Sequence, residues 1–370
     1  MKILHLSAVK SWGGGGNHIE NLYYELSLSH PEIENTIVVA KNGRFHERLK
    51  KGNFNYDTLY MKFKMDPRAI FKLIKLCRRE KYDLIHIHGS TSLTLAVIAH
   101  KIFKLPPFIL SKKTSFPIKN RWQTLYKYNH TNIKKILCVS EATKKITAES
   151  IEEPSKLVTI YHGTRIDNKD GRPSFLIRKK LNLSEETILI GNIGNHIRAK
   201  NLETLLLTAN YLVNEMNKKN FHFVQIGRFS ARTKALKLLV EKHNLISYFS
   251  FFDFIPNAQN LIPQFDLKIM TSQSEGLPQV IYEAFYHKVP VISTNVGGIP
   301  EIISHGKNGL LTDPFDFKKL AEHIVSLSEN EEQQLAFTET SYELLVNNFT
   351  SKIMAQKTLE AYKKVLNGEF

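Results

Sequence analysis

Cysteine is scarce in this sequence, with only two among 370 residues. Two cysteines cannot build the disulfide framework of a small secreted domain. Cys77 falls in a pattern typical of a helix face and Cys138 in a pattern typical of a buried strand. We therefore predict that both are free, reduced thiols of a cytosolic protein.

Long apolar runs are also missing. A membrane-spanning helix needs about 18 consecutive apolar residues, and the best stretch, residues 93–103, is interrupted by His100 and Lys101. The N-terminus runs from a short apolar segment directly into glycines, without the apolar core or cleavage site of a signal peptide. These absences predict a cytoplasmic protein that is neither exported nor inserted into a membrane.

The commonest nucleotide-binding motifs are absent as well. The sequence has no Gly-Lys-Ser/Thr phosphate loop. Residues 11–18 contain four glycines, but His18 occupies the place of the third glycine of the dinucleotide fingerprint, and no acidic residue ends the strand predicted at 36–40. No carboxylates or histidines show the spacing of metal ligands. We therefore expect no dinucleotide cofactor and no metal.

Basic residues are in excess, and they are concentrated in the first half of the chain. The net charge is +16, residues 1–170 hold 29 Lys/Arg against 15 Asp/Glu, and residues 41–81 alone hold 13 against 4. Such a surface attracts anionic lipid, phosphorylated substrates or nucleic acid. A general compositional drift towards lysine is the alternative explanation.

Short apolar runs alternate with helical patterns along the whole chain, which predicts parallel sheets in an α/β fold. With 42% hydrophobic residues, each half of the chain can bury its own core. A polar segment at 167–186 is the predicted linker. Helices are predicted at 17–28 and 66–80, and a closing amphipathic helix at 349–366. Strands are predicted at 2–6, 36–40, 83–88, 107–111, 136–140, 158–161, 187–193, 221–226, 266–270, 290–293 and 309–312.

Two candidate site segments lie in the first half, directly after predicted strands, where open α/β sheets bind ligands. The glycines at 13–16 leave backbone amides free to approach a ligand, although a plain tight turn explains them as well. His88 ends a buried strand, just before Gly89. His86 points to the same side but deeper. A hydrogen-bonded core histidine is the alternative reading of His88.

The second half carries two more candidate segments. In the first, Lys200 precedes Asn201, the predicted N-cap of a helix. A lysine beside a helix N-terminus suits the diphosphate of a leaving nucleotide, whereas simple capping is the alternative. In the second, Glu275 lies in a loop, Pro278 fits the first turn of a helix, and Glu283 lies further along it. Amides from Gly276 onward can face a phosphate or sugar, and the two carboxylates can accept hydrogen bonds from sugar hydroxyls and a ribose diol.

The segment 274–311 resembles the retaining glycosyltransferases of family 4, which have the GT-B fold. It carries their pattern of two glutamates separated by seven residues, followed by Pro-Val-Ile, Gly-Gly-x-Pro-Glu and Asn-Gly-Leu-Leu. The resemblance covers the whole chain, including the glycine segment, Asp83–Gly89, Val139–Glu141 and His162–Gly163. It implies two doubly wound Rossmann-like domains facing a central cleft. The N-terminal acceptor domain would span 1–166, the nucleotide-sugar domain 167–348, and helix 349–367 would return to the N-terminal domain.

The resemblance also implies roles for individual residues. Glu275 would contact the donor sugar, Glu283 the ribose and Lys200 the diphosphate. His88 would lie near the reacting centre and the acceptor. The other donor-binding positions implied are Gly15, Gly16, Asn195, Arg198, Gly227, Gly276, Leu277 and Pro278.

This sequence departs from the family pattern at two positions. Asn195 stands where the family usually has an arginine, and Arg198 is a candidate substitute from another place in the same loop. Phe229 stands where a second glycine commonly follows Gly227, which can reshape the wall that binds the base.

The expected activity is retaining, metal-independent transfer of a hexose or N-acetylhexosamine from a nucleotide sugar, expected to be UDP-linked. The acceptor would be a cell-envelope glycan or lipid-linked sugar of polysaccharide or lipopolysaccharide biosynthesis, and the enzyme would contact the inner face of an anionic membrane. One rival is a UDP-sugar epimerase of the same fold, which needs no acceptor. The other is a basic nucleic-acid-binding protein, whose affinity would fall with salt, but no recognition module supports it; we expect no nucleic-acid partner.

Overall fold

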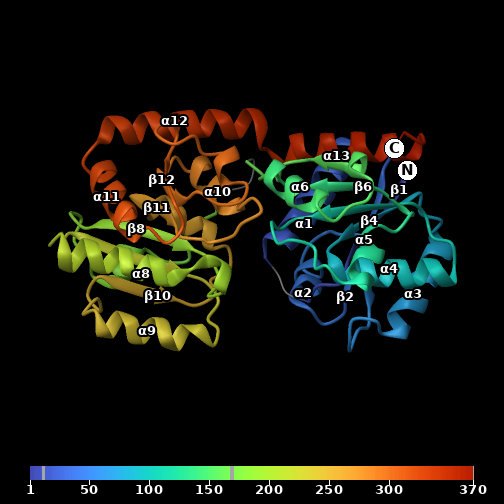
Figure 1. Ribbon diagram of the computed structural model, residues 1–370, viewed down its shortest axis with the longest axis horizontal. Helices are drawn as coiled ribbons and strands as arrows, with labels where there is room; N and C mark the ends of the chain where they lie inside the picture. The colour runs from blue at the N-terminus through green and yellow to red at the C-terminus, as the bar shows by residue number, and fades with distance from the viewer. Residues whose placement is uncertain (11–12, 167–170, 370) are drawn as a thin grey trace. The chain divides into compact units, whose positions relative to one another are not determined.

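The computed structural model describes residues 1–10, 13–166 and 171–369. The chain divides into two compact units (Figure 1). Unit 1 comprises residues 1–165 and 350–370, and unit 2 comprises residues 166–349. Both chain termini therefore belong to unit 1.

Unit 1 contains a seven-stranded parallel sheet in the order β3-β2-β1-β4-β5-β6-β7. Reversal of the strand order beside β1 is the mark of a doubly wound fold. Its elements are β1 (Lys2–Ser7), α1 (Gly14–Ser29), β2 (Glu34–Ala40), α2 (Arg44–Leu49), β3 (Tyr56–Leu59), α3 (Pro67–Glu80), β4 (Leu84–His88), α4 (Ser90–Ile102), β5 (Phe108–Lys112), α5 (Trp122–Tyr128), β6 (Ile133–Cys138), α6 (Glu141–Ala148), η1 (Pro154–Lys156), β7 (Leu157–Thr159) and α13 (Ser351–Leu366).

Unit 2 repeats the design with a six-stranded parallel sheet, in the order β10-β9-β8-β11-β12-β13. Its elements are α7 (Ile177–Leu181), β8 (Ile188–Ile193), η2 (Arg198–Lys200), α8 (Leu202–Asn210), η3 (Tyr211–Glu215), β9 (Phe221–Ile226), α9 (Arg232–Lys242), β10 (Phe249–Phe252), η4 (Ala258–Gln264), β11 (Leu267–Met270), α10 (Gln279–Tyr286), β12 (Val291–Thr294), η5 (Ile299–Glu301), β13 (Leu310–Thr312), α11 (Phe317–Ser328) and α12 (Glu331–Asn348). The predicted class, two doubly wound α/β domains, is confirmed.

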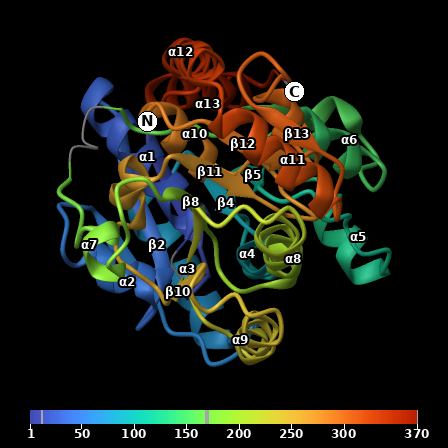
Figure 2. The same cartoon turned by 90° about the vertical axis from the view of Figure 1, so that its left-hand side faces the viewer.

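Helices cover both faces of each sheet. In unit 1, α3 and α4 bury one face, while α1 and α13 bury the other, where Leu22 and Leu26 pack with Leu359 and Tyr362. In unit 2, α8, α9 and α11 lie in a row along one face (Figure 2). Parallel strands buried on both faces need near-continuous apolar sequences, and β4 and β9 are buried throughout.

The structure corrects the sequence interpretation at two of the four edge strands. The prediction omitted β3 and β10, which lie at the edges of their sheets. Both strands are only four residues long and mostly half-buried. β3 has a mixed sequence, and β10 is apolar but too short for its periodicity to distinguish a strand from a helix or loop.

Two more boundaries differ from the prediction. Helix α1 begins at Gly14 rather than at residue 17, so three of the glycines form its first turn. The predicted linker, 167–186, includes the short helix α7, whose Ile177 is fully buried; residues 167–170 of that linker, like Ser11 and Trp12 of the glycine segment, lie outside the described residues.

Candidate active site

The candidate site of unit 2 lies at the carboxyl edge of its sheet. Strands β8, β11 and β12 are neighbours in the sheet, and η2, the loop 271–278 and the turn at 295–298 follow them. Because the strands are parallel, the segments that follow them meet at one edge. The sequence-predicted residues Lys200 and Glu275 come from two of these segments.

Lys200 and Glu275 form an ion pair. The Lys200 Nζ donates to the Glu275 Oε1 at 2.6 Å, and the Ser272 hydroxyl donates to the same oxygen at 2.6 Å. The two charged side chains are 19% and 13% exposed. A charge-assisted hydrogen bond that is partly shielded from water is stronger than one in bulk solvent. The pair thus provides a cation and a carboxylate that a ligand can still reach.

The loop that carries Glu275 is held on both sides. The amide of Gln273 donates to the carbonyl of Ala199 at 2.9 Å. The Thr294 hydroxyl of β12 donates to the carbonyl of Ser272 at 2.5 Å. These bonds tie the loop to η2 and to β12, so the geometry of the ion pair is set before any ligand binds.

The start of α10 follows this loop. Gly276 accepts a hydrogen bond from the amide of Gly298 at 2.8 Å, and Leu277 is buried. Pro278 occupies the N-cap, one residue before the predicted place in the first turn. Amides at a helix start have no intrahelical partner and suit an anion. Glu283 lies in the middle of α10 and is partly buried.

Asn195, Gly227 and Arg198 have distinct local roles. A Cβ on Gly227 would lie 2.0 Å from the carbonyl oxygen of Gly194, so only glycine permits this close approach of the β8 and β9 loops. The Asn195 Oδ1 accepts from the amide of Arg228 at 3.1 Å and braces the same contact. Arg198 is exposed on η2, two residues before Lys200.

The helix predicted to start after Asn201 does so, with Asn201 at the N-cap position. Its side chain, however, donates to the Thr204 hydroxyl at 2.6 Å and makes no capping bond to a backbone amide. The left-handed backbone of Asn201, with φ of 43°, turns its side chain away from the usual capping geometry.

Sequence reasoning missed Lys268, a fully buried lysine in β11. Its Nζ donates to the Asn192 Oδ1 at 3.3 Å and to the carbonyl of Ile269 at 2.8 Å. Burial lowers the pKa of Lys268 well below its usual value, and the charge of Lys200 lowers it further. A lone lysine within the apolar run Leu267–Met270 was the available signal.

Unit 1 holds a cluster of five buried histidines, which we call the histidine cluster: His5, His18, His86, His88 and His162. They come from β1, from α1, from the carboxyl half of β4 and from the segment after β7. Of these five, the sequence predicts a site role only for His88. His86 lies two residues before His88 on β4, whereas His5, His18 and His162 are distant in sequence and only the fold brings them close to it.

Hydrogen bonds distinguish the members of the cluster. His86 bonds to the hydroxyl of Tyr362 in α13 at 2.5 Å and to the Ser111 hydroxyl at 2.7 Å, as a core histidine does. The Nδ1 atoms of His18 and His162 lie 2.8 Å apart. Among the described residues, the buried Nδ1 of His88 has no hydrogen-bond partner.

Burial keeps this cluster neutral. It lowers the pKa of His5 to about 4 and that of His162 to about 3, and it holds the pKa values of His18, His86 and His88 well below their usual range. These rings are therefore uncharged at neutral pH.

Three of these imidazoles form a group that could hold a metal. One nitrogen each of His5, His86 and His88 lie within 4.8 Å of one another, a grouping that the sequence spacing did not reveal. Binding an ion would cost hydrogen bonds, because the rings already bond to Asn35, Tyr362 and Ser111. The described arrangement is a hydrogen-bonded network.

Gly15 and Gly16 lie in the first turn of α1. The carbonyl of Gly13 accepts the first bonds, from the amides of Gly16 and Asn17 at 2.9 and 3.0 Å. The Lys113 Nζ donates to the carbonyl of Gly15 at 3.2 Å. Burial lowers the pKa of Lys113 to about 7, so a basic group with a variable charge adjoins the start of the helix.

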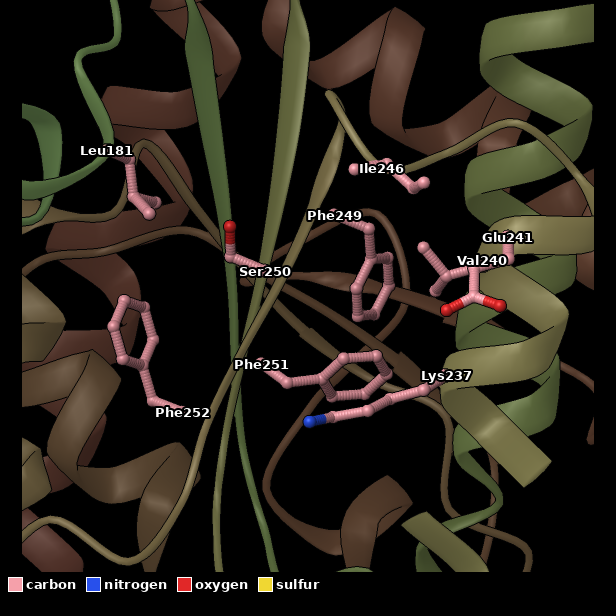
Figure 3. A pocket seen from close by; sticks show the side chains of 9 residues that line it. All are labelled: Leu181, Lys237, Val240, Glu241, Ile246, Phe249, Ser250, Phe251 and Phe252. Atoms are coloured by element: carbon pink, nitrogen blue, oxygen red, sulfur yellow. The ribbon is translucent and has the colours of Figure 1, made fainter. Parts of the chain in front are cut away.

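A pocket of about 380 Å³ lies elsewhere in unit 2, between α9 and the edge strand β10 (Figure 3). Phe249 and Phe251 point towards α9 and Phe252 to the opposite side of the strand (Figure 3). None of the predicted site residues lines this pocket.

Two protein families match the chain. Residues 12–168 match "Glycosyltransferase Family 4" and residues 174–344 match "Glycosyl transferases group 1". An N-acetyl-alpha-D-glucosaminyl L-malate synthase of Bacillus anthracis is 23% identical over 80% of this chain and 79% of its own length. An Escherichia coli UDP-Gal:alpha-D-GlcNAc-diphosphoundecaprenol alpha-1,3-galactosyltransferase is 22% identical over 72% and 71%.

Solved structures share the fold. HepE of Anabaena, crystallised with UDP-glucose, superposes with a TM-score of 0.86 at 19% identity, covering 98% of this chain and all of that one. A Rickettsia africae glycosyltransferase superposes with a TM-score of 0.83 at 22% identity, covering 99% and 98%. Two family matches that together span nearly the whole chain, and two doubly wound units, lead to one assignment: the chain belongs to the group 1, family 4 glycosyltransferases and has the GT-B fold.

Proposed function

We propose that this glycosyltransferase moves a hexose or N-acetylhexosamine, with retention of anomeric configuration, from a UDP-sugar to a hydroxyl of a cell-envelope glycan or lipid-linked acceptor. The observation that carries the proposal is the accessible Lys200–Glu275 ion pair at the carboxyl edge of the unit 2 sheet. The names of the similar proteins support the substrate class, since they include UDP-glucose complexes and a transferase acting on a diphosphoundecaprenol-linked sugar.

The ion pair suggests how unit 2 binds the donor. Without a ligand, Glu275 neutralises Lys200 at 2.6 Å. The diphosphate competes for the ammonium and for the amides at the start of α10, which leaves the Glu275 carboxylate to the transferred sugar. Glu283 binds the ribose, and the exposed Arg198 adds positive charge on η2. Gly276, Leu277 and Pro278 set the position of the amides.

The reaction then needs little from the protein beyond charge and position. The bond between the anomeric carbon and the UDP oxygen breaks, and that oxygen takes the proton of the acceptor hydroxyl. The acceptor oxygen bonds to the anomeric carbon on the same face. Lys200 stabilises the charge that develops on UDP. In unit 1, His88 and the first turn of α1, with Gly15 and Gly16, contact the sugar substrates.

The primary test is turnover of a panel of UDP- and GDP-sugars, with and without lipid-linked acceptors. Lys200→Ala should lower turnover about 10²–10³-fold, the scale for one lost electrostatic donor. Lys218→Ala is the matched control, because Lys218 forms a surface ion pair with Glu329 at 2.8 Å and should leave turnover unchanged. Acceptor-independent conversion of a UDP-sugar would identify an epimerase instead.

The proposed enzyme works without a metal, because Lys200 and the amides at the start of α10 stabilise the negative charge of the leaving group. Turnover in excess EDTA should therefore match the untreated rate. A tenfold loss that magnesium or manganese restores would rule out this part of the proposal.

We also propose that unit 1 docks on an anionic membrane, near lipid-linked acceptors. Among the described residues, no helix has the length and apolar character needed to cross a bilayer. Large apolar side chains are nevertheless exposed beside the basic residues of segment 41–81: Phe63 is 58% exposed and Phe71 62%. The charges of Lys64 and Lys127 interact, so the surface continues from this segment onto α5, where Trp122 is 74% exposed.

Exposed aromatic and basic side chains together suit the interface of an anionic bilayer. Vesicles containing phosphatidylserine or phosphatidylglycerol should float this protein, neutral vesicles should not, and high salt should release it. Phe63→Ser with Phe71→Ser should weaken binding, whereas Leu335→Ser, an exposed apolar residue of unit 2, should not. Equal recovery on neutral and anionic vesicles would leave compositional drift as the explanation of the basic excess.

A further inference from the structure

The protonation of His88 can be deduced from its neighbours, starting at Asn35. The Asn35 Nδ2 donates to the carbonyl of Ile33 at 3.3 Å, which fixes the orientation of the amide. The Asn35 Oδ1 therefore faces His5, whose Nε2 lies 3.2 Å away. An amide oxygen only accepts hydrogen bonds. His5 must carry a proton on Nε2.

The next step leads from His5 to His88. Because burial keeps His5 neutral, its Nδ1 carries a lone pair and no proton. The His88 Nε2 lies 3.3 Å from this nitrogen and must donate to it. His88 is itself neutral, so its second nitrogen, Nδ1, is an unprotonated acceptor. That atom is buried and has no partner among the described residues.

Strand register explains why these three side chains form a line. Asn35 of β2 pairs with Ile3 of β1, and His5 of β1 pairs with His86 of β4. Each step to the next strand therefore advances two residues towards the carboxyl edge, which keeps every side chain on the same face of the sheet. The line begins at a backbone carbonyl and ends at His88, the last residue of β4.

We propose that Asn35 and His5 are positioning residues that hold His88 in its Nε2-protonated form, so that its Nδ1 accepts a hydrogen bond from a sugar hydroxyl. The inference rests on the proposed function. The hydroxyl belongs either to the transferred sugar or to the acceptor. In both cases the arrangement admits a hydroxyl as donor and orients its oxygen, whereas the other tautomer would present an N–H at the same place.

Two variants at position 5 test the chain of hydrogen bonds from Asn35 through His5 to His88, which we call the relay, against simple packing. Glutamine at position 5 keeps one donor for Asn35 and one acceptor for His88, while leucine has a similar bulk and neither. In His5→Gln, kcat/KM should stay within a few-fold of wild type. In His5→Leu and Asn35→Leu it should fall about tenfold, the value of one lost hydrogen bond. UDP affinity, measured by calorimetry, should not change in any of them, because UDP binds to unit 2. Urea unfolding checks that unit 1 still folds in each variant.

A double variant tests whether His5 acts through His88. In a His88→Ala background, His5→Leu should have no further effect on kcat/KM. An additive loss there, or a His5→Gln variant as impaired as His5→Leu, would overturn the proposal. Donor hydrolysis without acceptor distinguishes the two hydroxyls. In His5→Leu the rate of donor hydrolysis should fall when the hydroxyl belongs to the donor sugar. Only the rate of transfer should fall when the hydroxyl belongs to the acceptor.

Nuclear magnetic resonance of protein labelled with ¹⁵N-histidine reads the tautomer without any turnover. The His88 signals, identified by their loss in His88→Ala, should show a proton on Nε2 in wild type and in His5→Gln. In His5→Leu this preference should weaken, because the buried N–H loses its acceptor. A His88 protonated on Nδ1 in wild type, or unaltered in His5→Leu, would refute the relay. If no nucleotide sugar is turned over, the proposed function fails while this measurement still decides the relay.

Discussion

The two glutamates of the candidate site differ in their surroundings, although they lie only eight residues apart. Glu275 sits in a loop and is held by Lys200 and Ser272. Glu283 lies on the helix α10, and the charges of both carboxylates act on the buried Lys268. A carboxylate paired with the proposed diphosphate-binding lysine and a carboxylate on the helix should therefore affect different parts of the donor.

This difference predicts that substitutions of the two glutamates change the affinity for UDP to different extents. Glu283→Ala removes the proposed acceptor of the ribose diol, a charge-assisted bond worth about 1.5–3 kcal/mol, and should weaken UDP binding accordingly. Glu275→Gln should bind UDP nearly as wild type does but lose most turnover, because its carboxylate stabilises positive charge at the anomeric centre. Calorimetry and steady-state rates measure both. Equal loss of UDP affinity in the two variants would show that the assigned roles are wrong.

Lys268 gives a prediction about stability. Its folded-state pKa lies well below the usual 10.5, so between these two values the unfolded chain binds one more proton than the folded chain. The free energy of unfolding of wild type should then rise with pH, by about 1.4 kcal/mol per pH unit from this group.

Lys268→Met removes this dependence while keeping much of the bulk. Its stability relative to wild type should decline as the pH rises towards 10. Urea unfolding at several pH values measures the difference. A difference that does not change with pH would mean that Lys268 is charged in the folded protein.

At the scale of elements, the glycines of α1 and of the β8–β9 contact serve different purposes. An added Cβ at Gly15 meets no atom within 4 Å, whereas at Gly227 it meets the Gly194 carbonyl oxygen at 2.0 Å. Gly15 is therefore not required by the packing of the folded chain. Its helical position would favour alanine by about 1 kcal/mol.

Gly15→Ala should consequently raise the thermal unfolding midpoint but increase the KM for the donor, because the methyl group blocks close approach to the helix amides. Gly227→Ala should lower the midpoint and weaken UDP binding, since two loops must separate. Differential scanning calorimetry and donor kinetics give the two readouts. A Gly15→Ala enzyme that is more stable and fully active would mean that no ligand contacts this turn.

At the scale of the whole molecule, the histidine cluster should make unit 1 sensitive to acid. The folded-state pKa of His5 is about 4 and that of His162 about 3, against about 6.5 in an unfolded chain. Below pH 6.5 the unfolded chain binds more protons, so stability should fall as the pH drops towards these values. Each ring contributes roughly 1.4 kcal/mol per pH unit within its window.

Urea unfolding followed at pH 7.5, 6 and 5 checks this expectation. His162→Gln removes one titrating ring and should reduce the slope relative to wild type. Stability that stays constant across this range would show that the histidines are already charged in the folded state, or that water reaches them.

The fold class and most of the carboxyl-edge segments of unit 2 can be predicted from the amino-acid sequence. Alternating apolar strands and helical patterns are local signals, and the motif from Glu275 to Glu283 is contiguous, so neither needs tertiary information. The edge strands β3 and β10 were not predicted because each is only four residues long, which is too short for a period of two to be recognised. The start of α1 at Gly14 was not predicted because consecutive glycines are typical of a loop.

Which polar groups contact one another depends on the folded structure. The pairing of Lys200 with Glu275 joins two loops 75 residues apart, and the line from Asn35 through His5 to His88 depends on strand register. The neutrality of Lys268 and of the histidines is likewise a consequence of burial, which no local pattern encodes. A sequence specifies which side chains are present along each strand, but hydrogen bonds and pKa values depend on neighbours that only the folded sheet places side by side.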